Sequence, residues 1–407
     1  MRALIVSQYF WPESFRINEL VRSLVAYGIA VDVLTGKPNY PEGKIYPGYR
    51  SAGGMREFWQ GANIFRVPIL PRGFGSGVRL FFNYLSFIFS AVLVGACQLR
   101  DTKSDVILVY APSPLLQALP ALFIGWIKRI PVVVYVQDLW PESLSATGYI
   151  KNGFIISLVE VLVRFIYRRS DLILVSSRPF KESIQRFSPT AEIVYYPNSV
   201  DASFCEPDHE TQVDVPALES GFRVVFAGNL GTAQAVHVIV EAAVLLQGKP
   251  EIRFVVFGSG SRYEWMRVQI EERRLTNLFL AGRFPFEAMP HLLSRASALL
   301  VTLADQEILA ATVPNKIQAY MAVGRPILAS LNGEGARLVM EADAGFAVPA
   351  EDSEALAEAI LKLHALPQEA REKIGNNARN YYRQHFDHEK LVSELIVRLS
   401  AVSKSEK

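Results

Sequence analysis

The sequence has few of the residues on which disulfide scaffolds and metal centres depend. Its only cysteines are Cys97 and Cys205 among 407 residues, which excludes a disulfide framework and a cysteine-rich metal site. It lacks the Asp-x-Asp, His-Glu-x-x-His, Walker and Gly-x-Ser-x-Gly motifs. The sequence therefore predicts neither a metal-dependent nor a serine-hydrolase mechanism, and we expect no cofactor.

An excess of charge of one sign is also absent. Lysine and arginine number 42, aspartate and glutamate 40, and the net charge is +2. A nucleic-acid-binding domain usually has a pI above about 9, and the pI here is about 8.4, so we predict no nucleic-acid partner. The chain opens directly as a strand at residues 2–8, without a charged leader, which predicts a cytoplasmic protein.

One long run without charge is present, from Leu80 to Leu99, between Arg79 and Arg100. Its length would just span a bilayer. Strand-like runs of one predicted sheet lie on both sides of it, and a membrane-spanning helix would split that sheet. We therefore expect a buried or interface-lying helix, with a transmembrane helix as the alternative.

Alternating apolar and helical patterns predict two α/β domains with mostly parallel sheets, since one core stops growing at roughly 250 to 300 residues. The first domain has predicted strands at 2–8, 30–35, 63–68, 105–111, 131–137, 171–176 and 192–196, and predicted helices near 13–27, 80–99, 114–129, 154–169 and 179–187. The second has predicted strands at 222–227, 252–257, 277–281, 298–303, 326–330 and 345–348. A linker is predicted at 201–220, and a helical, amphipathic stretch from about 369 to 403.

The second predicted domain contains glycine turns and a lysine at strand ends. In open α/β sheets, ligands bind outside the carboxyl ends of strands, where helix N-termini present free N–H groups to anions. The turn 226–235 and Gly258 each follow a strand, and Lys316 opens a short helix within the stretch 311–329. This pattern predicts a phosphate site, with plain tight turns as the alternative. It is not the G-x-G-x-x-G fingerprint, so a nicotinamide cofactor is not expected.

Polar and aromatic residues gather at one rim of the first predicted domain. The loop 8–18 places Arg16 at a helix start, where a guanidinium can hold phosphate or carboxylate. Asp138 follows another strand and is the best-placed carboxylate to orient or deprotonate a hydroxyl nucleophile. The alternative is that Asp138 caps the next helix and Trp140 fills the core.

A basic, apolar surface is also predicted. The stretch 154–169 is strongly apolar and carries Arg164, Arg168 and Arg169, and the uncharged run 80–99 lies nearby in sequence. Such a surface suits an anionic bilayer. Two core-facing helices with solvated ends are the alternative.

Over nearly its whole length the chain resembles glycosyltransferases of the GT-B fold. The motifs are Tyr9-Phe-Trp-Pro-Glu-Ser-Phe-Arg-Ile-Asn-Glu19, Pro38-Asn-Tyr-Pro41, Asp138-Leu-Trp-Pro-Glu-Ser143, Phe226-Ala-Gly-Asn-Leu-Gly231, Gly282-Arg-Phe-Pro285 and Asn332-Gly-Glu-Gly335. They are similar to those of glycosyltransferase family 4 and, within it, to the WbuB-type transferases of bacterial surface polysaccharide assembly.

The resemblance implies two facing Rossmann-like βαβ domains, with a C-terminal helix crossing back to the first. Residues 1–204, completed by 384–407, would bind the acceptor, and residues 205–383 the nucleotide-sugar. It implies a retaining, metal-independent hexosyl-type transferase that uses a UDP-sugar, with L-FucNAc or a related amino sugar as the family-level suggestion. The acceptor would be a polyprenyl-diphosphate-linked saccharide of O-antigen, capsule or exopolysaccharide biosynthesis, at the cytoplasmic face of the inner membrane.

The resemblance also implies roles for individual residues. The expected donor contacts are Gly228, Asn229, Gln234, Gly258, Arg283, Phe284, Pro314, Asn315, Lys316 and Glu334. The expected acceptor contacts are Arg16, Asn18, Asn39, Tyr40, Trp140 and Glu142, and the expected catalytic residues are Asp138, Lys316 and Glu307. The family's usual two glutamates, eight residues apart, fall at Ala311 and Ala319, and both are missing. Glu334 is a candidate to replace the ribose contact. Glu307 is a candidate for the contact near the donor sugar, with a solvated surface glutamate as the alternative.

Two other functions are compatible with these motifs. One is a GT-B epimerase or a soluble transferase that makes a small glycoside, neither of which needs a membrane-facing helix. The other is a non-catalytic two-domain protein that binds a sugar nucleotide, which the alanines at 311 and 319 suggest.

Overall fold

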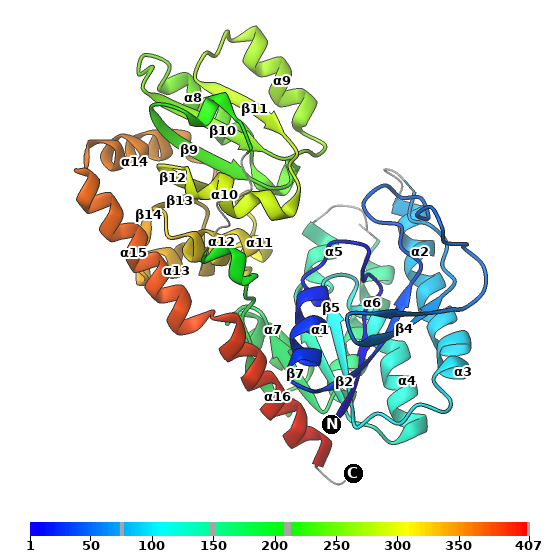
Figure 1. Cartoon of the computed structure of the whole chain (residues 1–407). Helices are drawn as coiled ribbons and strands as arrows, with labels where there is room; N and C mark the ends of the chain where they lie inside the picture. Colours follow the sequence, from blue (N-terminus) through cyan, green and yellow to red (C-terminus); the bar gives the residue numbers. More distant parts are fainter. Residues whose placement is uncertain (74–76, 147–151, 207–212, 405–407) are drawn as a thin grey trace. The chain divides into compact units, whose positions relative to one another are not determined.

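The computed structural model describes residues 1–73, 77–146, 152–206 and 213–404. The chain forms two compact units, residues 1–197 with 389–407 and residues 198–388 (Figure 1). These limits lie a few residues from the predicted ones, because the chain joins the second unit directly after Pro197. There the Tyr382 hydroxyl lies 3.2 Å from the Val200 nitrogen and 3.1 Å from its carbonyl. Residues 207–212 of the predicted linker and 405–407 of the predicted first domain lie outside the described residues.

The first unit contains an eight-stranded sheet in the order β3-β4-β2-β1-β5-β6-β7-β8. Its strands are β1 (Arg2–Val6), β2 (Ala30–Gly36), β3 (Met55–Trp59), β4 (Ala62–Val67), β5 (Val106–Ala111), β6 (Val132–Val136), β7 (Leu172–Val175) and β8 (Ile193–Tyr195). The strands pair in parallel except β3, which is antiparallel to β4. The sequence prediction missed β3, because this edge strand alternates exposed and half-buried residues and has no apolar run.

Helices cover both faces of this sheet. They are α1 (Ile17–Ala26), α2 (Gly77–Ser90), α3 (Ala96–Gln98), α4 (Ala118–Lys128), α5 (Glu142–Ala146), α6 (Gly153–Arg169) and α7 (Phe180–Phe187), with a π-helical turn at Ala91–Gly95 between α2 and α3. The last helix, α16 (His388–Lys404), completes this unit. Its Leu391, Leu395 and Leu399 share an apolar cluster with α1 and one face of the sheet.

The second unit contains a parallel six-stranded sheet in the order β11-β10-β9-β12-β13-β14. Its strands are β9 (Phe222–Ala227), β10 (Ile252–Phe257), β11 (Leu278–Gly282), β12 (Ala298–Thr302), β13 (Ile327–Ser330) and β14 (Gly345–Val348). Its helices are α8 (His237–Leu245), α9 (Tyr263–Glu272), α10 (Met289–Ser294), α11 (Glu307–Ala311), α12 (Asn315–Val323), α13 (Glu334–Glu341), α14 (Ser353–Ala365) and α15 (Gln368–His385).

Both sheets reverse their strand order beside their first strand, between β1 and β5 and between β9 and β12. Ligands of open α/β sheets bind outside the strand carboxyl ends at such a switch point. In the second unit, alternate residues of β9 face two apolar clusters, with Val225 in one and Val224 and Phe226 in the other. A sheet buried on both faces leaves its edge loops to carry the polar groups of a site.

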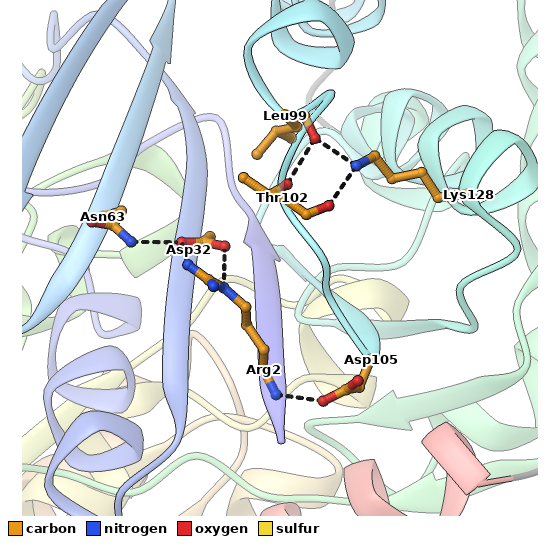
Figure 2. Close-up of polar contacts among 7 residues, drawn as sticks. All are labelled: Arg2, Asp32, Asn63, Leu99, Thr102, Asp105 and Lys128. Carbon is orange, nitrogen blue, oxygen red and sulfur yellow. Dashed lines mark hydrogen bonds and ion pairs between the residues drawn. The ribbon is translucent and has the colours of Figure 1, made fainter.

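The uncharged run lies along the first unit. Residues 77–98 form a helix long and apolar enough to cross a membrane by length and composition. Near its start, buried Asn83 accepts a hydrogen bond from Gln8 (2.7 Å) and donates one to the Leu70 carbonyl (2.5 Å). Beyond its end, Lys128 of α4 donates to the Leu99 and Thr102 carbonyls (Figure 2). Both ends of this helix are therefore attached by hydrogen bonds to the first unit.

At the edge of the same sheet where the strands begin, a buried carboxylate joins three neighbouring strands. Figure 2 shows the Arg2 guanidinium of β1 bound to Asp32 of β2, at 2.8 Å from Nε to Oδ2, with Asn63 of β4 donating to the other oxygen. Asp32 is fully buried, and a buried charge needs such partners. This edge is therefore structural, and the opposite edge carries the candidate site.

Candidate active site

Every residue predicted to contact the donor lies in the second unit, after the carboxyl end of a strand. Gly228, Asn229 and Gln234 follow β9, Gly258 follows β10, Arg283 and Phe284 follow β11, Glu307, Pro314, Asn315 and Lys316 follow β12, and Glu334 follows β13. Because these strands are parallel, their carboxyl ends share one edge of the sheet. The structure thus places the predicted donor residues at one rim.

The glycines at this rim are packed against each other through their backbones. Gly228 has φ +136° and Gly258 has φ +145°, in a region that residues with a side chain rarely adopt. A Cβ atom on Gly258 would lie 1.8 Å from the Gly228 carbonyl oxygen. The Gly228 N–H donates to the Phe257 carbonyl at 2.8 Å. Glycine at these two positions therefore lets the two turns pack directly against each other.

Lys316 lies over the first of these glycine turns. It is on the first turn of α12, which begins after Pro314 without a side-chain cap. Its Nζ is 4.1 Å from the centre of the Phe226 ring, and a Cβ on Gly228 would lie 2.6 Å from its Cε. Burial lowers the pKa of Lys316 to about 7. A bound diphosphate would supply the counter-charge that favours the ammonium form.

Aromatic and amide groups complete the rim. The Phe284 ring stands edge-on to Phe257 at 5.3 Å between centroids, and Arg283 beside it is exposed. The Gln234 carboxamide oxygen accepts hydrogen bonds from the Gly231 N–H (3.1 Å) and the Asn229 amide (3.2 Å). The structure therefore gives Asn229 and Gln234 a role in shaping the glycine turn.

Glu334 and Glu307, the candidates for the roles of the two missing family glutamates, lie in different surroundings. Glu334 opens α13 and is buried, and both of its carboxylate oxygens are bound by Arg337 at 2.7 Å. A Cβ on Gly335 would lie 3.2 Å from Pro314 Cδ, so the start of α13 is next to the start of α12. Glu307 opens α11 and is exposed. Glu334 is thus near the start of the helix that carries Lys316 but is already paired with Arg337, and Glu307 is open to solvent.

The rim of the first unit that is predicted to contact the acceptor, here called the acceptor rim, follows β1, β2 and β6. Asn18 accepts from the Trp11 N–H (3.0 Å) and donates to the Glu13 carbonyl (2.8 Å), and Asn39 is fully buried. These two amides shape the rim. Tyr40 is 37% exposed and available to a ligand, and Arg16 immediately precedes α1.

A buried carboxylate that the sequence analysis did not single out holds two of these loops together. Glu13 is 1% exposed and accepts hydrogen bonds from the N–H groups of Asn39 (2.7 Å), Tyr40 (2.6 Å) and Phe10 (3.3 Å). Burial raises the pKa of Glu13 to about 7, although the three N–H groups oppose the shift. The sequence signal that could have identified Glu13 is an acidic residue in the aromatic-rich loop directly after β1.

The Glu13→Gln variant is expected to remove a pH-dependent part of the stability. The folded state binds a proton at Glu13 more tightly than the unfolded chain, whose glutamate pKa is about 4.3. This contribution is complete below the unfolded pKa and is lost as pH rises through about 7. Thermal melting of both proteins from pH 5 to 8 should show wild type losing on the order of 1–3 kcal/mol relative to the variant. Parallel curves would contradict this assignment.

Asp138 lies just after the end of β6. It accepts a hydrogen bond from the Ser143 hydroxyl, and burial raises its pKa to about 6. Trp140 is 5% exposed and its Nε1 donates to Ser113 (3.3 Å), so Trp140 is a core residue. Within the described ranges, Oε2 of Glu142 and the hydroxyl of Tyr167 are buried without a hydrogen-bond partner. Buried polar groups are normally paired, and a buried water is the usual partner of such atoms.

The part of the chain that the structure describes contains no group of three or more His, Cys, Asp or Glu side chains able to hold a metal ion. Among the charged residues predicted at the donor rim, Arg283 and Lys316 are cations, Glu334 is paired with Arg337, and Glu307 is exposed. The rim can therefore bind an anion, and the acceptor rim can present a carboxylate to a hydroxyl group.

Comparison with known proteins agrees with this geometry. A profile described as Glycosyl transferase 4-like domain matches residues 14–199, and one described as Glycosyl transferases group 1 matches residues 208–381. The putative colanic acid biosynthesis glycosyl transferase WcaI of Escherichia coli is 26% identical over 97% of this chain and 99% of its own length.

Two solved structures show the same fold. Sucrose-phosphate synthase of Thermosynechococcus elongatus superposes with a TM-score of 0.73 at 18% identity, over 98% of this chain and 99% of its own. Anabaena HepE in complex with UDP-glucose superposes with a TM-score of 0.68 at 15% identity, over 98% and 100%. The two profile matches together span both units, and the chain belongs to the group 1 glycosyl transferases with a glycosyl transferase 4-like amino-terminal domain and the GT-B fold.

Proposed function

We propose that the protein transfers a sugar with retention of configuration, and without a metal ion or cofactor, from a UDP-sugar to a polyprenyl-diphosphate-linked saccharide. The product would belong to a bacterial surface polysaccharide such as O-antigen, capsule or exopolysaccharide, and L-FucNAc or a related amino sugar is the proposed donor sugar. The observation that carries the donor part is the Lys316 ammonium above the Gly228 turn. The full-length similarity to WcaI supports polysaccharide assembly.

In this proposal the second unit holds the UDP-sugar. Lys316 and the backbone of the Gly228 and Gly258 turns bind the diphosphate, and Phe284 and Arg283 lie where the base is expected. HepE, which shares the fold, was solved with UDP-glucose. As the sugar leaves, negative charge grows on the diphosphate, and the Lys316 ammonium, which the bound diphosphate favours, stabilises it.

The acceptor hydroxyl attacks the anomeric carbon from the face that the diphosphate leaves. One carbon–oxygen bond forms as the bond to the diphosphate breaks, and Asp138 accepts the hydroxyl proton. With a pKa of about 6, Asp138 is ionised at neutral pH and basic enough to take part in the step. Glu334, paired with Arg337, and Glu307 are proposed substitutes for the two missing glutamates.

We propose that the protein is peripheral on the cytoplasmic face of the inner membrane. Large apolar side chains are exposed on three helices of the first unit: Phe89 and Leu93 on the α2–α3 helix, Trp126 on α4, and Phe154 and Val161 on α6, between 63% and 79% exposed. Cations flank them, among them Arg100, Arg129, Arg164, Arg168 and Arg169. Exposed apolar and aromatic side chains rimmed by cations bind an anionic bilayer.

A Phe89→Ser/Leu93→Ser variant is expected to bind vesicles of phosphatidylglycerol and phosphatidylcholine at least tenfold more weakly, because each side chain loses burial worth about 1.5–3 kcal/mol. Co-flotation with vesicles measures the change. Val397→Ser is the matched control, since Val397 is 68% exposed on α16, which packs with α1 on one face of the sheet. Equal flotation of all three proteins would remove the membrane surface from the proposal.

The whole proposal is tested by incubating the protein with a panel of nucleotide-sugars, EDTA and a short polyprenyl-diphosphate-GlcNAc. Mass spectrometry should find a product one sugar heavier than the acceptor. NMR of this product should show that the transferred sugar keeps the anomeric configuration that it had in the donor. A product that needs a divalent ion would refute metal independence. Absence of product with every donor, together with no thermal stabilisation by UDP, would refute the donor site.

A further inference from the structure

A pocket of about 490 Å³ opens on the first unit beside α2, in the size range of small-molecule sites. Two backbone segments meet at its base, where the Gly73 N–H donates to the Gly43 carbonyl at 3.0 Å. A Cβ on Gly43 would lie 2.3 Å from the Gly73 oxygen, and one on Gly73 would lie 2.7 Å from Cδ of Arg79. Glycine at both positions therefore lets the segments meet and lets Arg79 lie over the base.

The walls and the rim of this pocket differ in chemistry. Leu70, Pro71 and Phe82 form apolar walls, and Lys44 and Arg79 are the charged residues that line it. Lys44 and Arg79 are exposed, and Phe82 is 51% exposed. Among the described residues that line the pocket, the charged ones are both cations. An apolar pocket with two cations matches a ligand that has an anionic head and an apolar tail.

The pocket lies beside both the predicted acceptor rim and the apolar helix α2. The Arg72 N–H donates to Oδ1 of Asn39 at 3.0 Å, and the Arg72 guanidinium is 4.9 Å from the Tyr40 ring centre. Asn83 of α2 donates to the Leu70 carbonyl and, at 3.4 Å, to the same Asn39 oxygen. A ligand with its tail in a bilayer at α2 would bring its head past the pocket toward the acceptor rim.

We propose that this Lys44–Arg79 pocket binds the isoprenoid diphosphate that carries the acceptor saccharide. Lys44 and Arg79 hold the diphosphate, and Leu70, Pro71 and Phe82 contact the first isoprene units. The inference rests on the proposed lipid-linked acceptor, and it assigns the diphosphate to Lys44 and Arg79 in place of Arg16. Arg16 lies at the start of α1, where its charge acts on the buried Tyr110.

The experiment titrates the full-length protein with farnesyl diphosphate, farnesol and inorganic diphosphate by calorimetry. Wild type should bind farnesyl diphosphate more tightly than either fragment. Lys44→Gln/Arg79→Gln should raise its Kd about 10- to 100-fold, because two charge-assisted contacts at a partly exposed site are lost. Phe82→Asn should raise the Kd of farnesyl diphosphate and not that of inorganic diphosphate. The control Lys249→Gln/Lys373→Gln removes the same charge from exposed positions of the second unit.

A second readout separates this inference from the proposed function. With polyprenyl-diphosphate-GlcNAc, Lys44→Gln/Arg79→Gln should raise the acceptor KM by the same factor and leave the donor KM unchanged. If wild type glycosylates this acceptor and the double variant has its normal KM, the pocket assignment is wrong and the proposed function stands. If Arg16→Gln raises the acceptor KM and the double variant does not, the pocket assignment is also wrong. If wild type neither binds farnesyl diphosphate nor uses the acceptor, both fail.

Discussion

Replacement of Asp138 by asparagine is expected to lower kcat about 10²- to 10⁴-fold, the range in which a positioned general base contributes. The change keeps the size of the side chain and removes the group proposed to accept the hydroxyl proton. Ser143, which donates to the Asp138 carboxylate, can still donate to the asparagine oxygen. The donor KM should stay unchanged, because the proposed donor residues belong to the other unit.

The pH profile gives this prediction a second measurement. Burial raises the pKa of Asp138 to about 6, so wild-type kcat/KM should fall as pH drops through about 6 and the base becomes protonated. The residual activity of the variant should not show this fall. Glu182→Gln, which changes an exposed carboxylate on α7, is the matched control. A variant that keeps a third or more of the wild-type rate would exclude Asp138 as the base.

The parallel strands were predictable because they are buried on both faces and read as apolar runs. Val132 to Val136, for example, are five buried residues in succession. Strand β3 was not predicted because this edge strand alternates half-buried and exposed residues and therefore has no apolar run. The loops that carry the site were found because glycine, proline and charged residues interrupt the sequence where these strands end. Position after a strand end is thus enough to identify the candidate rim.

The partners within each rim were not predictable in the same way. Glu13 acts on Asn39 and Tyr40 across 26 and 27 residues, and Asn83 of α2 binds Gln8 across 75. Such pairings depend on which strands are neighbours, which the sequence pattern does not reveal. The ion pair between Glu334 and Arg337 could have been predicted, because residues three apart share a helix face. Glu334 would have to release Arg337 in order to bind the ribose in the proposed role.

Replacement of Lys316 by methionine is expected to weaken UDP binding about 10- to 100-fold, because a charge-assisted contact worth roughly 1.5–3 kcal/mol is lost. The rate of transfer should fall further, by about 10²- to 10³-fold, since the charge on the diphosphate grows as the sugar leaves. Methionine retains the apolar stem that packs beside Phe226 and Gly228. Calorimetry with UDP and the transfer assay measure the two effects separately.

The pH dependence of UDP affinity tests the same residue without relying on the size of the loss. Burial lowers the pKa of Lys316 to about 7, so above pH 7 the free site is increasingly neutral. Binding the diphosphate then requires uptake of a proton, and wild-type affinity should fall by up to about tenfold per pH unit above pH 7 until the pKa of the complex is reached. The terminal phosphate of UDP, whose pKa is about 6, is already ionised there. Lys316→Met should bind with no such slope, and Lys316→Arg, which stays charged, should also lack it. An equal slope in all three proteins would show that the diphosphate does not contact Lys316.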